Sequence, residues 1–163
     1  MSEPFLVFLI KPPPDVADEL DFVRQKLGLY RGYSKDRLHA TVQPLGYRRM
    51  LSDATISKAR FAAESLVHPP FHVVFDRLNG GKLEGSEPIK GFLAFRASLQ
   101  TELAKHMALR KHSTSPHITL VYRAAPASCQ VDPISWLVEE FMLIESFQGE
   151  GRHEELGRWK LRF

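Results

Sequence analysis

The chain has a single cysteine among its 163 residues, Cys129, so it can form neither an internal disulfide nor a cysteine-based zinc site. Long hydrophobic runs are also missing. The apolar run at residues 5–10 is too short to span a membrane, and Lys11 and three prolines follow it. Glu3 stands where a secretory signal would carry basic residues. We therefore expect a protein that enters no membrane and works in the reducing cytoplasm.

Neither sign of charge dominates, with 22 Lys and Arg against 19 Asp and Glu. The formal net charge is +3 at pH 7, which is too small an excess to indicate nucleic-acid binding by itself, although it suits a substrate that carries phosphate. Apolar residues make up 44% of the chain, which is enough to build a core. The length predicts one domain, or two lobes that share a core.

Two similar tetrapeptides carry the strongest signal in the sequence. Segments 39–42 (His-Ala-Thr-Val) and 117–120 (His-Ile-Thr-Leu) each place a histidine two residues before a threonine, in a stretch with β-strand alternation. Residues i and i+2 of a strand share a face, so each segment holds an imidazole beside a hydroxyl. In the first strand this alternation also places Gln43 on the histidine face, and Pro44 and Gly46 are expected to end the strand. Two such pairs suggest a duplicated half-site.

Hydrophobic periodicity predicts the remaining elements. The expected strands are residues 5–10, 38–45, 71–78, 89–95, 116–122, 141–146 and 159–163. Three helices are expected: the first follows the prolines at 12–14 and ends at Gly28, the second begins at Ser52 or Asp53, and the third runs from 96 to 111. Loops are expected at 30–35 and 124–132. Strand, helix and His-Thr strand thus occur twice in the same order, up to residue 46 and again from 89 to 122. Because hairpins as well as helices separate the strands, the pattern predicts an α+β fold with antiparallel sheets.

These segments resemble the 2H phosphoesterase superfamily, which is named for two His-x-Thr-x motifs. The chain is most similar to its bacterial RNA 2′,3′-cyclic phosphodiesterases, also called 2′-5′ RNA ligases. The similar segments are 38–46, 115–120, 141–146 and 156–161, together with the opening strand and the prolines after it. The resemblance implies a two-lobed, pseudo-twofold α+β duplication, with antiparallel sheets flanked by helices and an active-site cleft between the lobes. One bilobal domain would span residues 1–163.

The resemblance also implies an activity. The protein would be a phosphodiesterase without metal or cofactor that hydrolyses 2′,3′-cyclic phosphate ends of RNA or nucleotides to 2′-phosphomonoesters. His39 would be the general acid that protonates the leaving 3′ oxygen, and His117 the base that activates water, although the residues alone leave these roles interchangeable. Thr41 and Thr119 can donate to the phosphate oxygens. Strand alternation returns Arg123 to the histidine face, which makes it a further candidate phosphate ligand. The expected partner is RNA or a nucleotide, and the expected state is a monomer.

Two alternatives stay open. One is another reaction of the superfamily, namely 2′-5′ ligation or hydrolysis of 2′-5′ oligonucleotides or ADP-ribose cyclic phosphate. The other is a non-catalytic module that binds RNA ends. The remaining histidines show no catalytic pattern: two prolines separate His68 from His72 and exclude a helical metal pair. We expect His106, His112 and His153 to be exposed.

Overall fold

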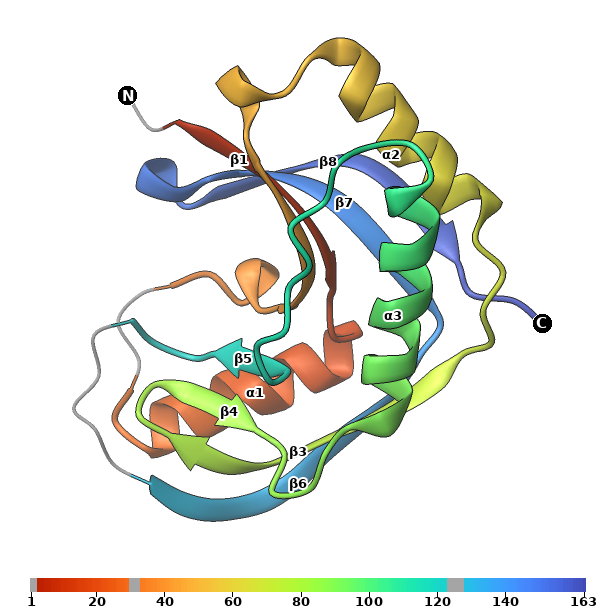
Figure 1. Cartoon of the computed structure of the whole chain (residues 1–163). Coiled ribbons are helices and arrows are strands. Elements are labelled where there is room, and N and C mark those ends of the chain that lie inside the picture. Colours follow the sequence, from red (N-terminus) through yellow and green to blue (C-terminus); the bar gives the residue numbers. More distant parts are fainter. Residues whose placement is uncertain (1–2, 30–32, 123–127) are drawn as a thin grey trace.

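Eight β-strands and three α-helices make up the computed structural model, which describes residues 3–29, 33–122 and 128–163 (Figure 1). The strands are β1 (Pro4–Ile10), β2 (Ala40–Tyr47), β3 (Phe71–Asn79), β4 (Lys82–Glu84), β5 (His117–Thr119), β6 (Ser128–Val138), β7 (Glu140–Phe147) and β8 (Arg152–Lys160). The helices are α1 (Pro14–Lys26), α2 (Asp53–Ser65) and α3 (Lys90–Ala104), and short 3₁₀ turns are η1 (Lys35–Arg37), η2 (Arg48–Met50) and η3 (Gln148–Glu150). None of the helices within these ranges is long and apolar enough to cross a membrane.

All eight strands form one antiparallel sheet in the order β6-β3-β4-β5-β2-β1-β7-β8. The strands that carry the two His-x-Thr segments, β5 and β2, are neighbours in the middle, where Ala40 pairs with Ile118. Four strands therefore lie in each half, and the two motifs meet where the halves join. The predicted antiparallel α+β fold is confirmed.

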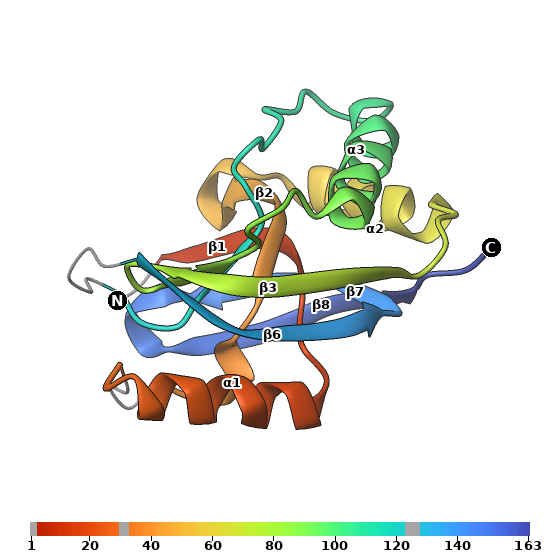
Figure 2. The ribbon, with the colours of Figure 1, turned by 90° about the horizontal axis from the view of Figure 1, so that it is seen from below.

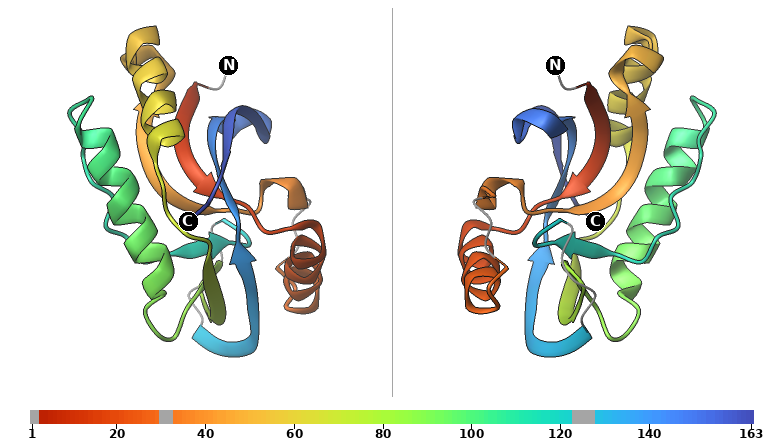
Figure 3. Two further views of the ribbon diagram at one scale, coloured as in Figure 1. Left: turned by 90° about the vertical axis from the view of Figure 1, so that its right-hand side faces the viewer. Right: turned by 90° about the vertical axis from the view of Figure 1, so that its left-hand side faces the viewer.

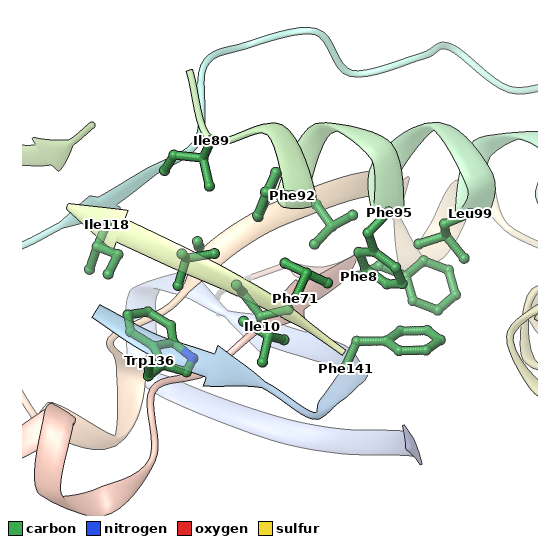
Figure 4. Close-up of a cluster of buried hydrophobic side chains, with 14 of the residues drawn as sticks. Phe8, Ile10, Phe71, Ile89, Phe92, Phe95, Leu99, Ile118, Trp136 and Phe141 are labelled. Carbon is green, nitrogen blue, oxygen red and sulfur yellow. The ribbon is translucent and has the colours of Figure 1, made fainter. Parts of the chain in front are cut away.

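The helices cover the sheet unequally. α2 and α3 pack against each other on one side, while α1 lies on the other (Figures 2 and 3). Helix α3 points Phe95 into the main core, where its ring contacts Phe71 of β3 and Phe141 of β7, with centroid distances of 5.3 and 5.0 Å (Figure 4). Since β3 and β7 belong to different halves of the sheet, this aromatic contact joins the halves behind the motifs.

Strand β1 is buried on both faces, as its continuous apolar run predicts. Phe8 and Ile10 belong to the main core under α2 and α3. Val7 and Leu9 point the opposite way and form a second cluster with two residues of β7. This second cluster supports the face of the sheet on which the motif histidines lie.

The expected strand at 89–95 is wrong, because α3 begins at Lys90 and β3 pairs instead with β4. Gly80, with φ +65°, makes the tight turn between β3 and β4. Phe92, Phe95 and Leu99 recur at helical spacing and are all fully buried. The order of strand, helix and His-Thr strand still occurs twice, but in the second copy the hairpin β3-β4 precedes α3 and β5.

The expected loop at 124–132 is also wrong from Ser128 onward, where β6 begins. β6 is an edge strand, so its polar residues and Pro133 lie exposed and hide the strand pattern. The last strand, β8, begins at Arg152 rather than at residue 159, and β5 is shorter than expected.

A β-bulge changes the predicted faces of β2. Leu9 of β1 pairs with Thr41, but Phe8 pairs with Gln43, so Val42 is an extra residue between two pairs. Gln43 therefore joins Phe8 on the core side, and its predicted place beside the motif histidine is wrong. The strand also continues through Pro44 and beyond Gly46, to Tyr47.

Candidate active site

The two motifs face one open cleft. Ala40 and Ile118, the central residues of the motifs, are fully buried in the main core. Because neighbouring residues of a strand point to opposite faces, the histidines and threonines on either side of them face away from that core. All four, His39, Thr41, His117 and Thr119, line a single cleft of about 1200 Å³. The structure thus brings together every motif residue that the sequence predicted, whereas Arg123 lies outside the described residues.

The two imidazoles are held in the same way. Nδ1 of His39 lies 2.6 Å from the carbonyl oxygen of Arg37, and Nδ1 of His117 lies 2.9 Å from that of Ser115. In each motif the acceptor is the residue two positions before the histidine. Each Nδ1 therefore donates to a carbonyl, which leaves the lone pair of the neutral ring on Nε2. Each Nε2 can then accept a proton when the ring is neutral and release one when it is charged.

The cleft favours anions. Its side chains within the described ranges include two cations and four histidines but no aspartate or glutamate; the cations and histidines are Arg37, Lys82, His39, His112, His117 and His153. No group of three or more His, Cys, Asp or Glu in the described part of the chain is arranged to hold a metal ion. The arrangement suits a phosphate, which would be the principal negative charge in the cleft.

Burial and neighbouring cations act on the histidines in the same direction. Burial lowers the pKa of His39, and the positive charges of Lys11 and Arg37 lower it further, against the hydrogen bond to the Arg37 carbonyl. Burial likewise lowers the pKa of His153 to about 3, with Lys11, His39 and Arg37 adding to the effect. Both rings are therefore mainly neutral near pH 7 in the free protein. A bound anion would raise both pKa values, because it stabilises the charged imidazolium.

Acid is expected to destabilise the fold through these rings. Below pH 6.5 the unfolded chain protonates His153, but the folded protein does not until about pH 3, so stability falls as the pH falls through this window. We expect the free energy of unfolding to fall by about 1 kcal/mol between pH 6.5 and 5, because solvent screens the charge of this half-buried ring in part. Urea unfolding at the two pH values measures it. His153→Gln should lose less unfolding free energy than the wild type over this pH range. An equal loss would contradict the conclusion that His153 causes the acid sensitivity.

Several residues of the cleft were not found from the sequence, among them Lys82, two histidines and Arg37. His112 and His153 line it, so their predicted exposure is wrong; His106, also partly buried, lies instead against the ring of Phe61. Nε of Arg37 is buried and has no hydrogen-bond partner in the described part of the chain, although the side chain lines the cleft. Arg37 ends the 3₁₀ turn η1, outside the strand alternation that links His39 to Thr41, so the sequence pattern contains no signal for it.

Polar side chains fix the segment that leads to the second motif. Gln43 of β2 accepts from the His112 amide at 3.0 Å and donates to the Arg110 carbonyl at 3.0 Å. From α3, Gln100 donates to the His112 carbonyl at 2.9 Å and Arg96 to the carbonyl of residue 114 at 2.6 Å. The backbone just before His117 is thereby tied both to the first motif strand and to α3.

A buried arginine supports the other end of β5. Arg24 of α1 is 1% exposed and forms an ion pair with Asp21. It also donates to the carbonyl oxygens of Leu120, at 3.4 Å, and Tyr33, at 2.8 Å. Since Tyr33 and Leu120 flank the cleft, this guanidinium fixes two of its borders.

Comparison with known proteins places this cleft in a family. The sequence profile described as "2'-5' RNA ligase superfamily" matches residues 12–150. The chain belongs to the 2′-5′ RNA ligase superfamily. A search among curated proteins gives no match.

Solved structures share the fold over the whole chain. Apo LigT of E. coli is 27% identical, with a TM-score of 0.78 over 99% of this chain and 100% of that one. LigT of E. coli complexed with 3'-AMP is 25% identical, with a TM-score of 0.77 over 98% and 99% of the chains. TT0787 of Thermus thermophilus, 21% identical with a TM-score of 0.74 over 97% and 98%, shares the fold. Like LigT, this chain is a 2H phosphoesterase of the superfamily.

Proposed function

We propose that the protein is a phosphodiesterase that hydrolyses 2′,3′-cyclic phosphate ends of RNA or nucleotides to 2′-phosphomonoesters without a metal ion. One observation carries the proposal: two imidazoles with matching Nδ1 contacts and two hydroxyls line one cleft, to which the described residues contribute no carboxylate. Two further findings support it. The superfamily is that of the 2′-5′ RNA ligases, and structures of E. coli LigT exist with phosphate, 3'-AMP, ATP and NADP+.

In the proposed reaction the cyclic phosphate binds between the two histidines. Nε2 of His117 takes a proton from water as the water oxygen attacks phosphorus. The bond from phosphorus to the 3′ oxygen breaks in line with the attack, and Nε2 of His39 gives that oxygen a proton. The hydroxyls of Thr41 and Thr119 and the guanidinium of Arg37 stabilise the charge on the non-bridging oxygens. The product carries a 2′-phosphate and a free 3′-hydroxyl, and proton exchange with water resets both rings.

The environment of His39 suits the acid role once the substrate is bound. A lowered pKa makes its imidazolium a stronger acid, which helps protonate an alkoxide. Near neutral pH the free ring is mainly uncharged, so it must acquire its proton as the substrate binds. The negative charge of the phosphate favours that proton uptake. We therefore expect binding of 3'-AMP to be accompanied by net proton uptake.

A substrate panel tests the proposal. The purified protein is incubated, with a chelator present, with the four nucleoside 2′,3′-cyclic phosphates and with an oligoribonucleotide that ends in a cyclic phosphate. We expect hydrolysis, with products that carry only 2′-phosphate as judged by phosphorus NMR. Hydrolysis to 3′-phosphates, or no hydrolysis of any of these compounds, would contradict the proposal.

The same residues acting in reverse would join or cleave a 2′-5′ linkage, which is the reaction that names the superfamily. Oligoribonucleotides with 2′-5′ linkages and ADP-ribose cyclic phosphate therefore belong in the panel. A faster reaction with one of these compounds would favour the alternative substrate. RNA-end binding that survives loss of both motif histidines, with no turnover by the wild type, would favour a non-catalytic module.

A further inference from the structure

A third imidazole contacts the first motif. His153 lies on β8, where it pairs across the sheet with Ser146, and both residues line the cleft. The ring of His153 stands against that of His39, with the centroids 5.3 Å apart and the planes at 67°. A residue from the far end of the chain thus reaches the same space as the two motif histidines.

The polar atoms of this ring form no hydrogen bond with the described residues. Nδ1 of His153 is buried and has no hydrogen-bond partner among the described residues, unlike Nδ1 of His39 and of His117. An unpaired buried acceptor is more readily tolerated than an unpaired buried N–H group, so the ring proton belongs on Nε2. Nε2 is not among the buried atoms that lack a partner, so in this cleft-lining residue it is the ring nitrogen open to solvent and can act as a donor.

The surroundings keep this donor neutral. Lys11, Arg37 and His39 face the ring from the neighbouring elements, and all three lower the pKa of His153. On its own strand, Glu155 and Arg158 form an ion pair with each other, with 2.6 Å between their atoms. With a pKa of about 3 in the free protein, the ring meets the substrate as a neutral group near pH 7, and its N–H group can bind an anion.

We propose that His153 is a substrate-binding residue whose Nε2–H donates a hydrogen bond to an oxygen of the ribose phosphate held between His39 and His117. The inference rests on the proposed function for the nature of the ligand, a nucleotide with a phosphate at its ribose. The contact between the rings places the donor beside His39, and the unpaired polar edge gives it no competing partner within the described part of the protein. A neutral donor adds binding without adding a third proton to the reaction.

Three variants separate substrate binding from ring packing. His153→Phe keeps a flat ring against His39 but removes the N–H group, whereas His153→Gln keeps a donor. His72→Phe is the matched control, because His72 is exposed on β3 and does not line the cleft. With a nucleoside 2′,3′-cyclic phosphate we expect His153→Phe to raise KM about tenfold, as for loss of a hydrogen bond to a charged group, and to change kcat by less than about threefold. His153→Gln, which keeps a donor, should raise KM less than His153→Phe does, and His72→Phe should stay within about threefold of the wild type in both constants.

Binding of inorganic phosphate and 3'-AMP, measured by calorimetry, keeps the test independent of turnover. We expect His153→Phe to weaken both about tenfold, and phosphate to shift the nitrogen-15 resonance of Nε2 of His153. Weakened binding in a protein that hydrolyses no cyclic phosphate would refute the proposed function and leave His153 as an anion ligand. Normal hydrolysis with unchanged KM and phosphate affinity in His153→Phe would overturn the role of His153. A drop in kcat shared by His153→Phe and His153→Gln would also overturn it, since His153 would then act only by positioning His39.

Discussion

Replacement of either motif histidine by alanine is expected to abolish hydrolysis of a 2′,3′-cyclic phosphate while the protein stays folded. Each ring would perform one of the two proton transfers, and a general acid or base contributes roughly 10²–10⁴-fold to the rate. We therefore expect His39→Ala and His117→Ala each to lower kcat by about 10³-fold or more. Each imidazole has one hydrogen bond to a backbone carbonyl, so its loss should cost little stability. Steady-state kinetics with thermal unfolding of the same samples measures both effects.

The matched control is His72→Ala, which removes an exposed histidine from β3 and should leave kcat unchanged. The double variant of His39 and His117 should lose about as much activity as the worse single variant, because the two rings act in one reaction. Near-normal turnover in either single variant would rule out the mechanism. A large loss of thermal stability in both would mean that the missing activity says nothing about proton transfer, and His117→Gln would then be the variant to measure.

Local sequence patterns were sufficient to predict a helix or strand where the apolar residues of the segment fit only one type of element. β1, α1 and α2 lie close to their predicted positions, because an unbroken apolar run or a single apolar stripe permits one reading. Residues 89–95 permit two readings, since their aromatic and aliphatic residues suit a strand as well as a helix. The segment forms a helix that packs closely against β3. A Cβ atom on Gly91 would lie 2.8 Å from Cβ of Phe71, so glycine at this position permits the close approach of α3 to β3. No pattern within seven residues contains that information.

The site residues likewise fall into those that the local pattern predicts and those that only long-range contacts place in the cleft. The pairs His39–Thr41 and His117–Thr119 follow from strand alternation, which acts over two residues. Gln43 does not, because one extra residue in β2 reverses the faces beyond Thr41, and bulges leave no reliable mark in a single sequence. His153 reaches the cleft only because β8 lies beside β7 and the sheet brings its ring against His39, which is a long-range contact.

Substitution of the buried amide that reversed the predicted face, Gln43→Leu, is expected to have the largest effect on stability. Gln43 is fully buried, and all four of its hydrogen-bonding positions are occupied. Its Nε2 donates to the carbonyls of Pro44, at 2.8 Å, and Arg110, at 3.0 Å. Its Oε1 accepts from Nε2 of Gln100, at 2.8 Å, and from the amide of His112, at 3.0 Å. A leucine of similar size fills the space but forms none of these bonds.

The loss of stability in Gln43→Leu comes from the hydrogen-bond partners of Gln43, which the leucine leaves unpaired. In Gln43→Leu the buried Nε2 of Gln100 loses a partner, and so do the part-buried His112 amide and Arg110 carbonyl. A group left unsatisfied away from water costs about 1–3 kcal/mol. We expect the free energy of unfolding, measured in urea, to fall by about 3 kcal/mol. The same change frees the backbone just before Ser115, whose carbonyl orients His117, so kcat should also fall, by about tenfold or more. The loss of activity should appear at temperatures well below unfolding.

Two comparisons make this result specific to the buried network. Gln25→Leu changes an exposed glutamine on α1 whose side chain bonds, among the described residues, to Asp21 alone, and it should alter the unfolding free energy by less than about 0.5 kcal/mol. The double variant of Gln43 and Gln100 should cost less than the sum of the single variants, because both belong to one hydrogen-bond network. If Gln43→Leu unfolds within about 1 kcal/mol of the wild type and keeps its kcat, the two motifs are not coupled through this side chain. In that case the orientation of His117 depends on the contacts that Arg96 and Gln100 make from α3.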